Sequence, residues 1–184
     1  MSWLARKLKR FSISGKTRII VWRSTGGTQF PLAPGVTVRK VTLADLYDAR
    51  SMEDDSTIDY LRSVIGKGYH AWFAYCDGIV VHRSLMLAGP SRYNLWHWTA
   101  GLQVPEKEGV ILGCATHKDY GGRGIYASVL SLIANDPTWK AVWGFTEVDN
   151  TASQRGLTKA GFREHHTLSV RAWHGFAHVD RTEL

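Results

Sequence analysis

A cluster of three glycines between an apolar run and an amphipathic segment constrains this chain more than any other feature. The apolar run covers 110–115, the cluster is Gly121, Gly122 and Gly124, and apolar residues recur at helical spacing over 125–133. This order predicts a strand, a glycine loop and a helix. The start of a helix offers unpaired backbone N–H groups and the positive end of the helix dipole, which attract phosphate. The loop is therefore either a tight turn into the helix or a site for a phosphate-bearing ligand.

Size and charge narrow the classes of protein that fit. The chain has 184 residues with 44% hydrophobic and 21% charged residues, which predicts a single globular domain with a buried core. Its net charge of +7 favours anionic partners such as phosphates, nucleic acid or an acidic membrane surface. Nucleic-acid signatures such as paired Cys-x-x-Cys are missing, so no nucleic-acid partner is expected. The glycine spacing also matches neither the P-loop nor the dinucleotide fingerprint.

The cysteines and the first residues bear on the compartment. Cys76 and Cys114 both lie in apolar runs, as small core residues of a protein in a reducing compartment do. No apolar run reaches the roughly 18 residues that span a bilayer, and no signal peptide is apparent. Residues 1–11 combine one apolar helical face with basic residues, a pattern of either a helix on anionic lipid or a solvated terminus. We therefore expect a cytoplasmic protein, with peripheral membrane contact through 1–11 as an open alternative.

Periodicity and turn residues predict alternating strands and helices along the chain. Asp77-Gly78 between two apolar runs is a strong hairpin signal, because this pair readily forms a type I′ turn. Thr42 is a plausible helix N-cap, and Gly161 is a plausible residue just beyond a helix. The expected strands are 17–23, 36–41, 70–76, 79–87, 93–99, 110–115, 140–148 and 162–173. The expected helices cover 43–47, 56–66, a segment from 125 to the Asn135-Asp136-Pro137 stop, and a segment from 149 to 161.

Two of these segments resemble the signature motifs of the GNAT (Gcn5-related N-acetyltransferase) superfamily. Residues 116–126 resemble the motif R/Q-x-x-G-x-G/A, and residues 150–162 resemble N-x-x-S followed by K-x-G-F. The resemblance covers about residues 36–173. It implies an α/β (α+β) domain over 36–184 with a mixed, mostly antiparallel sheet, a V-shaped splay between two parallel strands, and flanking helices. Residues 1–35 would then be a basic N-terminal segment with room for one extra strand.

The resemblance also implies a donor and the residues that bind it. Acetyl-CoA or another acyl-CoA would place its pyrophosphate on the loop amides and its pantetheine arm along the second motif, with no metal. Three positions depart from the family pattern: Gly121 replaces Arg or Gln, Tyr126 replaces a small residue and should reshape the loop, and Leu157 replaces the tyrosine that often acts as general acid. The implied donor-binding residues are Ala115, Thr116, Gly121, Gly122, Arg123, Gly124, Ile125, Tyr126, Asn150 and Ser153.

The reaction that the resemblance implies needs a base for the attacking amine and a group that stabilises the oxyanion. Glu147 is the leading candidate base, because it is an ionisable residue at the end of an apolar strand; a surface carboxylate is the alternative. His117, just before the glycine loop, is the second candidate, because histidine is a common general base. The resemblance, however, places the His117 position against the donor backbone.

Other reactive side chains have simpler interpretations. His82 and His97 either face the acceptor or are structural, and Cys114 fits core packing because no activating partner is predicted. His165 and His166 are adjacent in a strand, so we expect them on opposite faces and expect no zinc site.

The expected function is transfer of an acyl group from CoA to a primary amine of a small molecule. Trp96 and Trp98 are candidates for stacking on a sugar ring, although most tryptophans are core residues. Ile125-Tyr126 at the end of the glycine loop and the Ser-Gln-Arg-Gly run at 153–156 resemble GNAT members associated with surface-glycan or lipid assembly. This resemblance favours an amino sugar, or a precursor of a surface glycan or lipid, as the acceptor. An acyl-CoA-binding sensor or scaffold without turnover is the alternative. A homodimer is compatible with either function.

Overall fold

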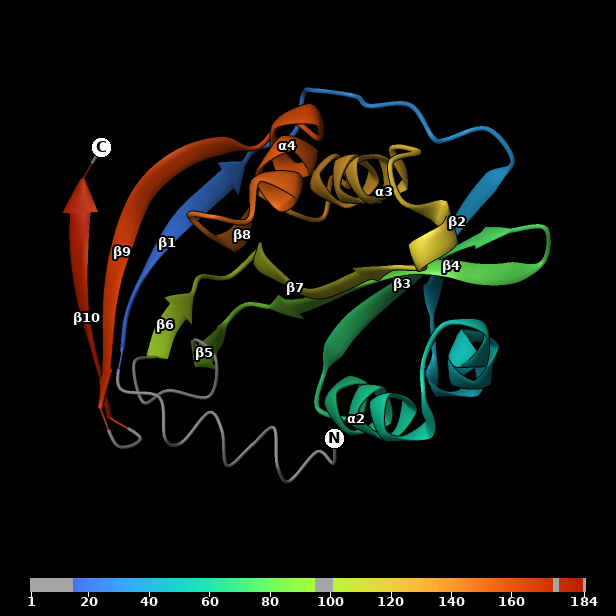
Figure 1. Ribbon diagram of the computed structural model, residues 1–184, viewed down its shortest axis with the longest axis horizontal. Coiled ribbons are helices and arrows are strands. Elements are labelled where there is room, and N and C mark those ends of the chain that lie inside the picture. The colour runs from blue at the N-terminus through green and yellow to red at the C-terminus, as the bar shows by residue number, and fades with distance from the viewer. Residues whose placement is uncertain (1–14, 95–100, 174–175, 184) are drawn as a thin grey trace.

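The computed structural model describes residues 15–94, 101–173 and 176–183 (Figure 1). Eight strands form one sheet in the order β10-β9-β1-β8-β7-β4-β3-β2. They are β1 (Gly15–Ser24), β2 (Val36–Val41), β3 (Tyr69–Cys76), β4 (Ile79–Ala88), β7 (Glu108–Thr116), β8 (Ala141–Glu147), β9 (Arg163–Trp173) and β10 (Phe176–Glu183). The short strands β5 (Ser91–Asn94) and β6 (Gly101–Val104) pair separately. The helices are η1 (Leu43–Ser51), α2 (Asp55–Ile65), η3 (Lys118–Tyr120), α3 (Ile125–Ala134) and α4 (Thr151–Lys159).

Helices cover both faces of the sheet, so the molecule has three layers (Figure 1). One core cluster joins α3 and α4 to the sheet and includes Val129, Leu130 and Leu157. The other joins η1 and α2 to the opposite face around Leu46 and Leu61. These residues recur at helical spacing within their helices, which explains why one stripe of each helix is buried.

β7 and β8 are the parallel pair of the main sheet, and they separate soon after they begin. Their register covers Glu108–Ala141, Gly109–Val142 and Val110–Trp143 and then ends. Beyond that point β7 follows β4 as far as Thr116, whereas β8 follows β1 as far as Glu147. The predicted V-shaped splay and the mixed, mostly antiparallel sheet are therefore confirmed.

A bulge bends β7 just beyond the point of separation. Arg83 of β4 pairs with Ala115 and Leu85 pairs with Leu112, so Gly113 and Cys114 together oppose one residue of β4. Gly113 has a φ of +56°, which a residue with a side chain rarely adopts. The Arg83 guanidinium donates to the Gly113 carbonyl and to the Glu53 carboxylate. Bulges bend a strand and increase its twist, and this one lies in the part of β7 that no longer pairs with β8.

The first described strand lies inside the sheet rather than at its edge. β1 pairs antiparallel with β8 on one side and with β9 on the other. The strand expected at 17–23 is thus confirmed as an internal strand. The division of the chain into 1–35 and 36–184 stays a prediction.

Most other expected elements are also found. The Asp77-Gly78 turn has φ values of 50° and 79°, as a type I′ turn requires. The helix expected after Thr42 is a 3-10 helix, η1, and its start is capped by Asp45, which accepts from the Thr42 N–H at 2.7 Å. The strand expected at 93–99 overlaps β5 only at 93–94, because 95–100 lie outside the described residues, as do 1–11.

The expectation that His165 and His166 lie on opposite faces of their strand is wrong. Their Nδ1 atoms lie 2.7 Å apart, so both rings are on the same side of β9. The register between β1 and β9 shifts between Val21 and Trp22, which pair with His166 and Glu164. His165 is therefore the extra residue of a bulge, and a bulge interrupts the alternation of side chains.

Among the described helices, none is both long enough and apolar enough to cross a bilayer.

Candidate active site

The glycine loop joins the end of β7 to α3 in the conformation that its residues require. Gly122 has a φ of +75° and Gly124 a φ of +80°, and Gly124 is the N-cap of α3. A Cβ on Gly122 would meet nothing within 4 Å, so glycine is needed there for the backbone and not for space. Gly121, Gly122 and Arg123 are exposed. The first N–H groups of α3 have no partner within the helix, so the loop presents donors for an anion.

The side chains beside the loop add charge and order. The Arg123 guanidinium lies 4.7 Å from the centroid of the Tyr120 ring and donates to the Asp119 carbonyl at 3.2 Å. His117 accepts from the Asp119 N–H at 3.3 Å, and its ring meets the edge of Tyr120. His117 therefore caps η3 through Nδ1, and this hydrogen bond uses the lone pair with which a neutral imidazole would accept a proton. The role of His117 as base stays a prediction.

Tyr126 connects the two motifs. Its hydroxyl lies 2.9 Å from Ser153 Oγ in the first turn of α4, and its ring lies 5.9 Å from the His82 ring. A Cβ on Gly156 would clash with the Tyr126 ring, so the ring packs directly on the α4 backbone. Burial, followed by proximity to Cys114, raises the pKa of the Tyr126 phenol. The side chain thus leaves the loop and spans from α3 to α4, which the sequence did not indicate.

His82 ties β4 to the end of β7 beneath Tyr126. It is 0% exposed, with Nδ1 2.8 Å from Thr116 Oγ1 and Nε2 2.9 Å from Ser84 Oγ. Burial, followed by the charge of Arg83, lowers the pKa of His82 to about 3, so the ring is neutral at physiological pH. The structural interpretation of His82 is therefore the better one.

Cys114 continues this polar network at the bulge. Its Sγ lies 3.3 Å from Ser84 Oγ, and burial raises the pKa of its thiol to about 11. A thiol that keeps its proton at neutral pH is a poor nucleophile, which supports the expected packing role. His97, Trp96 and Trp98 lie outside the described residues.

The start of α4 is fixed by caps at the end of β8. Asn150 Oδ1 accepts from the Ser153 N–H at 3.1 Å, and the Gln154 side chain donates to the carbonyls of Glu147 and Val148. The Glu147 side chain is exposed at the diverging end of β8. Leu157 is 1% exposed and belongs to the core, so this position offers no proton donor.

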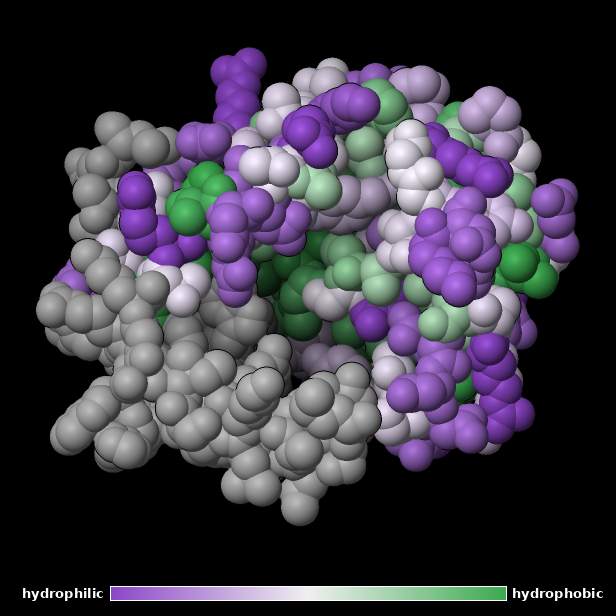
Figure 2. Space-filling view, viewed as in Figure 1, coloured by the Kyte–Doolittle hydropathy of each residue, from purple (hydrophilic) through white to green (hydrophobic). Residues whose placement is uncertain are grey.

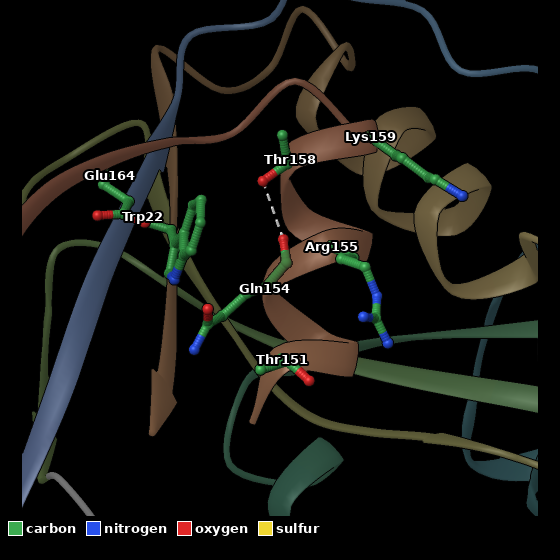
Figure 3. Close-up of a pocket in the computed structure, with 7 residues that line it drawn as sticks. All are labelled: Trp22, Thr151, Gln154, Arg155, Thr158, Lys159 and Glu164. Atoms are coloured by element: carbon green, nitrogen blue, oxygen red, sulfur yellow. Dashed lines mark hydrogen bonds between the residues drawn. The ribbon is translucent and has the colours of Figure 1, made fainter. Parts of the chain in front are cut away.

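Two concave regions border α4. Figure 2 shows a hollow with an apolar floor in the middle of the view, where β7 and β8 part in Figure 1. A separate, open pocket of about 360 Å³ lies between α4, β1 and β9 (Figure 3). Its lining residues are Trp22, Thr151, Gln154, Arg155, Thr158, Lys159 and Glu164. None of the predicted donor-binding residues lines this second pocket, so we place the candidate site at the splay.

Known structures share this architecture, although neither the family models nor the curated proteins match the sequence. A GNAT-family acetyltransferase from Colwellia psychrerythraea aligns with a TM-score of 0.60 and 12% identity, over 91% of this chain and 60% of that one. A GCN5-related N-acetyltransferase from Sphaerobacter thermophilus aligns with a TM-score of 0.58 and 15% identity, over 98% of this chain and 56% of that one. The chain thus spans less than two thirds of these two proteins.

A smaller protein aligns over most of its own length. AAC(6')-Iy, solved in complex with the bisubstrate analogue CoA-S-monomethyl-acetylneamine, has a TM-score of 0.54 and 15% identity, over 70% of this chain and 91% of that one. Together with the splay and the glycine loop, these likenesses show that the chain has the fold of the GNAT acetyltransferases. At such low identity they show the fold alone.

The contact between Tyr126 and Gly156 predicts that Gly156→Ala destabilises the protein when the Tyr126 ring is present and stabilises it when the ring is removed. Gly156→Ala should destabilise the wild type by about 1–3 kcal/mol, because the new methyl group displaces the Tyr126 ring. In a Tyr126→Ala background the same change should stabilise by about 0.5–1 kcal/mol, because alanine is the better helix former. Urea unfolding of the four proteins measures both effects. An effect of equal sign in both backgrounds would contradict the packing.

The burial of neutral His82 predicts a loss of stability on acidification. An unfolded histidine binds its proton with a pKa of about 6.5, whereas the folded value is about 3. The contribution is complete above about pH 6.5 and falls by up to about 1.4 kcal/mol per pH unit below it. His82→Asn should therefore flatten the pH dependence of the unfolding free energy between pH 6.5 and 4.5. An NMR titration that protonates the folded His82 ring near pH 6.5 would refute this.

Proposed function

We propose that this protein transfers an acyl group, in the simplest case acetyl, from an acyl-CoA to a primary amine of a small molecule. The observation that carries the proposal is the early separation of β7 and β8 together with a glycine loop at the start of α3. Separated strands leave room for a slender thioester arm, and the start of the helix offers N–H groups to a pyrophosphate.

The donor would lie along both motifs. Backbone N–H groups from Gly121 to Tyr126 would hold the pyrophosphate, with the exposed Arg123 guanidinium adding positive charge. Ser153 and Asn150 at the start of α4, with Ala115 and Thr116 at the end of β7, would border the pantetheine arm. Because capture rests on backbone N–H groups, the missing Arg or Gln at position 121 should weaken binding only modestly.

The chemistry would proceed by direct attack of the amine on the thioester carbonyl. The C–N bond forms, the C–S bond breaks, and the amine loses a proton while the leaving thiolate gains one. We assign the base to Glu147, whose exposed carboxylate stands at the open end of the splay, with His117 as the second candidate. The side chain of Leu157 has no acidic group, so the proton for the leaving CoA thiolate would come from water or from the phenol of Tyr126.

An amino sugar or a related glycan or lipid precursor is our proposed acceptor. The likeness to AAC(6')-Iy, whose analogue carries acetylneamine, supports a small amine of this kind. A second function is favoured by one specific observation, the buried Leu157 in place of the usual acid. Under that alternative the protein is an acyl-CoA-binding sensor or scaffold. Cytoplasmic location, membrane contact through 1–11 and a homodimer remain proposals compatible with both.

A thiol-release assay with acetyl-CoA separates the two functions. Amino sugars, nucleotide amino sugars, polyamines, amino acids and peptides serve as acceptors, with donors of several acyl lengths. Release of free CoA that depends on one amine class supports the enzyme. Tight acetyl-CoA binding without release for any acceptor supports the sensor.

The loop assignment predicts that two glycines of equal backbone strain differ in their effect on the donor. Gly122 and Gly78 both have positive φ values, and a Cβ on either meets nothing within 4 Å. Alanine at either position should cost about 1–2 kcal/mol of stability. Only Gly122→Ala should also weaken acetyl-CoA binding, by at least about tenfold by calorimetry, because it disturbs the N–H groups that hold the pyrophosphate. Equal donor affinity in both variants would reject the loop as the donor site.

The base assignment predicts a loss of turnover without a loss of binding. Glu147→Gln should lower kcat on the order of 10²-fold or more, because an amide cannot accept the proton of the amine. The donor Kd should stay unchanged. Asp149→Asn, a neighbouring exposed carboxylate, is the matched control and should retain activity. Wild-type kcat in Glu147→Gln would eliminate this residue as the base.

A further inference from the structure

The connection between β1 and β2 runs over α4 and α3 and is tied along the length of α3 (Figure 1). At the end of α3, the Gly27 N–H donates to Asn135 Oδ1 at 2.8 Å, and Asn135 Nδ2 donates to the Thr28 carbonyl at 2.7 Å. One turn earlier, Ser131 Oγ accepts from the Phe30 N–H at 2.9 Å. The connection therefore runs antiparallel to α3, from its end toward its start.

This path brings an aromatic ring to the glycine loop. A Cβ on Gly124 would lie 3.2 Å from Phe30 Cε1 and 3.5 Å from Cζ, so the ring lies against the Gly124 backbone. Phe30 is only half-buried, which leaves part of its ring open to solvent. An aromatic surface thus stands directly beside the first N–H groups of α3.

Phe30 and Tyr126 flank the start of α3 on opposite sides. Successive helical residues are rotated by about 100°, so Tyr126 projects about 200° away from Gly124. Tyr126 points toward Ser153 and His82, at the splay. Phe30 lies on the Gly124 side, together with Ser131 and the connection.

We propose that the adenine base of the donor stacks on the Phe30 ring. The site would therefore bind CoA more tightly than 4′-phosphopantetheine, which lacks the adenosine of CoA. The inference rests on the proposed function. In CoA the pyrophosphate separates the pantetheine arm from the adenosine. If the arm enters the splay past Tyr126, the adenosine leaves on the other side of the loop, where Phe30 stands.

The chemistry of the ring fits this role. A purine is a planar π-system, and alanine substitution of an aromatic side chain that stacks on a base weakens binding by roughly 5- to 150-fold. The backbone of Phe30 is anchored, because its N–H donates to buried Ser131, and its ring packs against Gly124. A preorganised ring loses little conformational freedom when a base stacks on it.

Two ligands and three variants test the proposal. CoA and 4′-phosphopantetheine are titrated calorimetrically into the wild type, Phe30→Leu, Phe30→Trp and Leu32→Ala. Phe30→Leu should weaken CoA binding about tenfold and change phosphopantetheine binding less than twofold, whereas Phe30→Trp should retain the CoA affinity. Leu32, 44% exposed on the same connection, is the matched control and should affect neither ligand. Thermal unfolding verifies that each variant is folded.

The other outcomes overturn the inference in distinguishable ways. If Phe30→Leu weakens both ligands equally, the ring only supports the loop, and if it weakens neither, the base lies elsewhere. If the wild type binds phosphopantetheine as tightly as CoA, no adenosine subsite exists. A wild type that binds neither ligand would overturn the proposed donor site itself, and this inference with it.

Discussion

The early end of the pairing between β7 and β8 is the constraint on which the rest of the structure depends. Two parallel strands that separate after Val110 leave backbone and side-chain groups without the neighbour that a continuous sheet would provide. The bulge at Gly113 lies just beyond the last pair of β7 and β8. Arg83 donates to the Gly113 carbonyl and pairs with Glu53, and the two side chains are only 14% and 12% exposed. The bulge beside the opening is thus stabilised by Arg83 and Glu53, from the face of the sheet that α2 covers.

On the face of the sheet that α3 and α4 cover, a connected set of side chains borders the opening. His82 joins β4 to the end of β7, and Tyr126 lies across it toward Ser153 on α4. A buried polar network of this kind is stabilising only when its members are satisfied, and each of these groups has a partner. The two motifs that resemble the GNAT signatures are therefore in direct contact, because Tyr126 packs on Gly156 and its hydroxyl lies 2.9 Å from Ser153 Oγ.

The placement of β1 determines which segment lies beside the glycine loop. Because β1 lies between β8 and β9, the chain must return across both helices to reach β2 at the far edge of the sheet. That return is bonded to Ser131 and Asn135 and carries Phe30 to the N-cap of α3. The sheet order thus determines which side chains surround the loop, although no residue of this connection belongs to either motif.

The sequence by itself determined the features that depend on local residue pattern: the Asp77-Gly78 turn, the start of a helix close to Asn150, and the glycine loop between a strand and a helix. Apolar periodicity predicted most element bounds, because it reports which face of each element is buried. The splay was expected only from the resemblance of the two motifs to the GNAT superfamily. Only the tertiary structure decided the position of β1, the strands β6 and β10, the bulge at His165, and the contacts of Tyr126 with Ser153 and of Phe30 with Gly124. The position of β1, the bulge at His165 and the contacts of Tyr126 and Phe30 depend on residues about 30 to more than 100 positions apart, whose proximity follows from sheet order and helix packing and leaves no periodic signal in the chain. The strands β6 and β10 instead pair with β5 and β9, which directly precede them in the described chain.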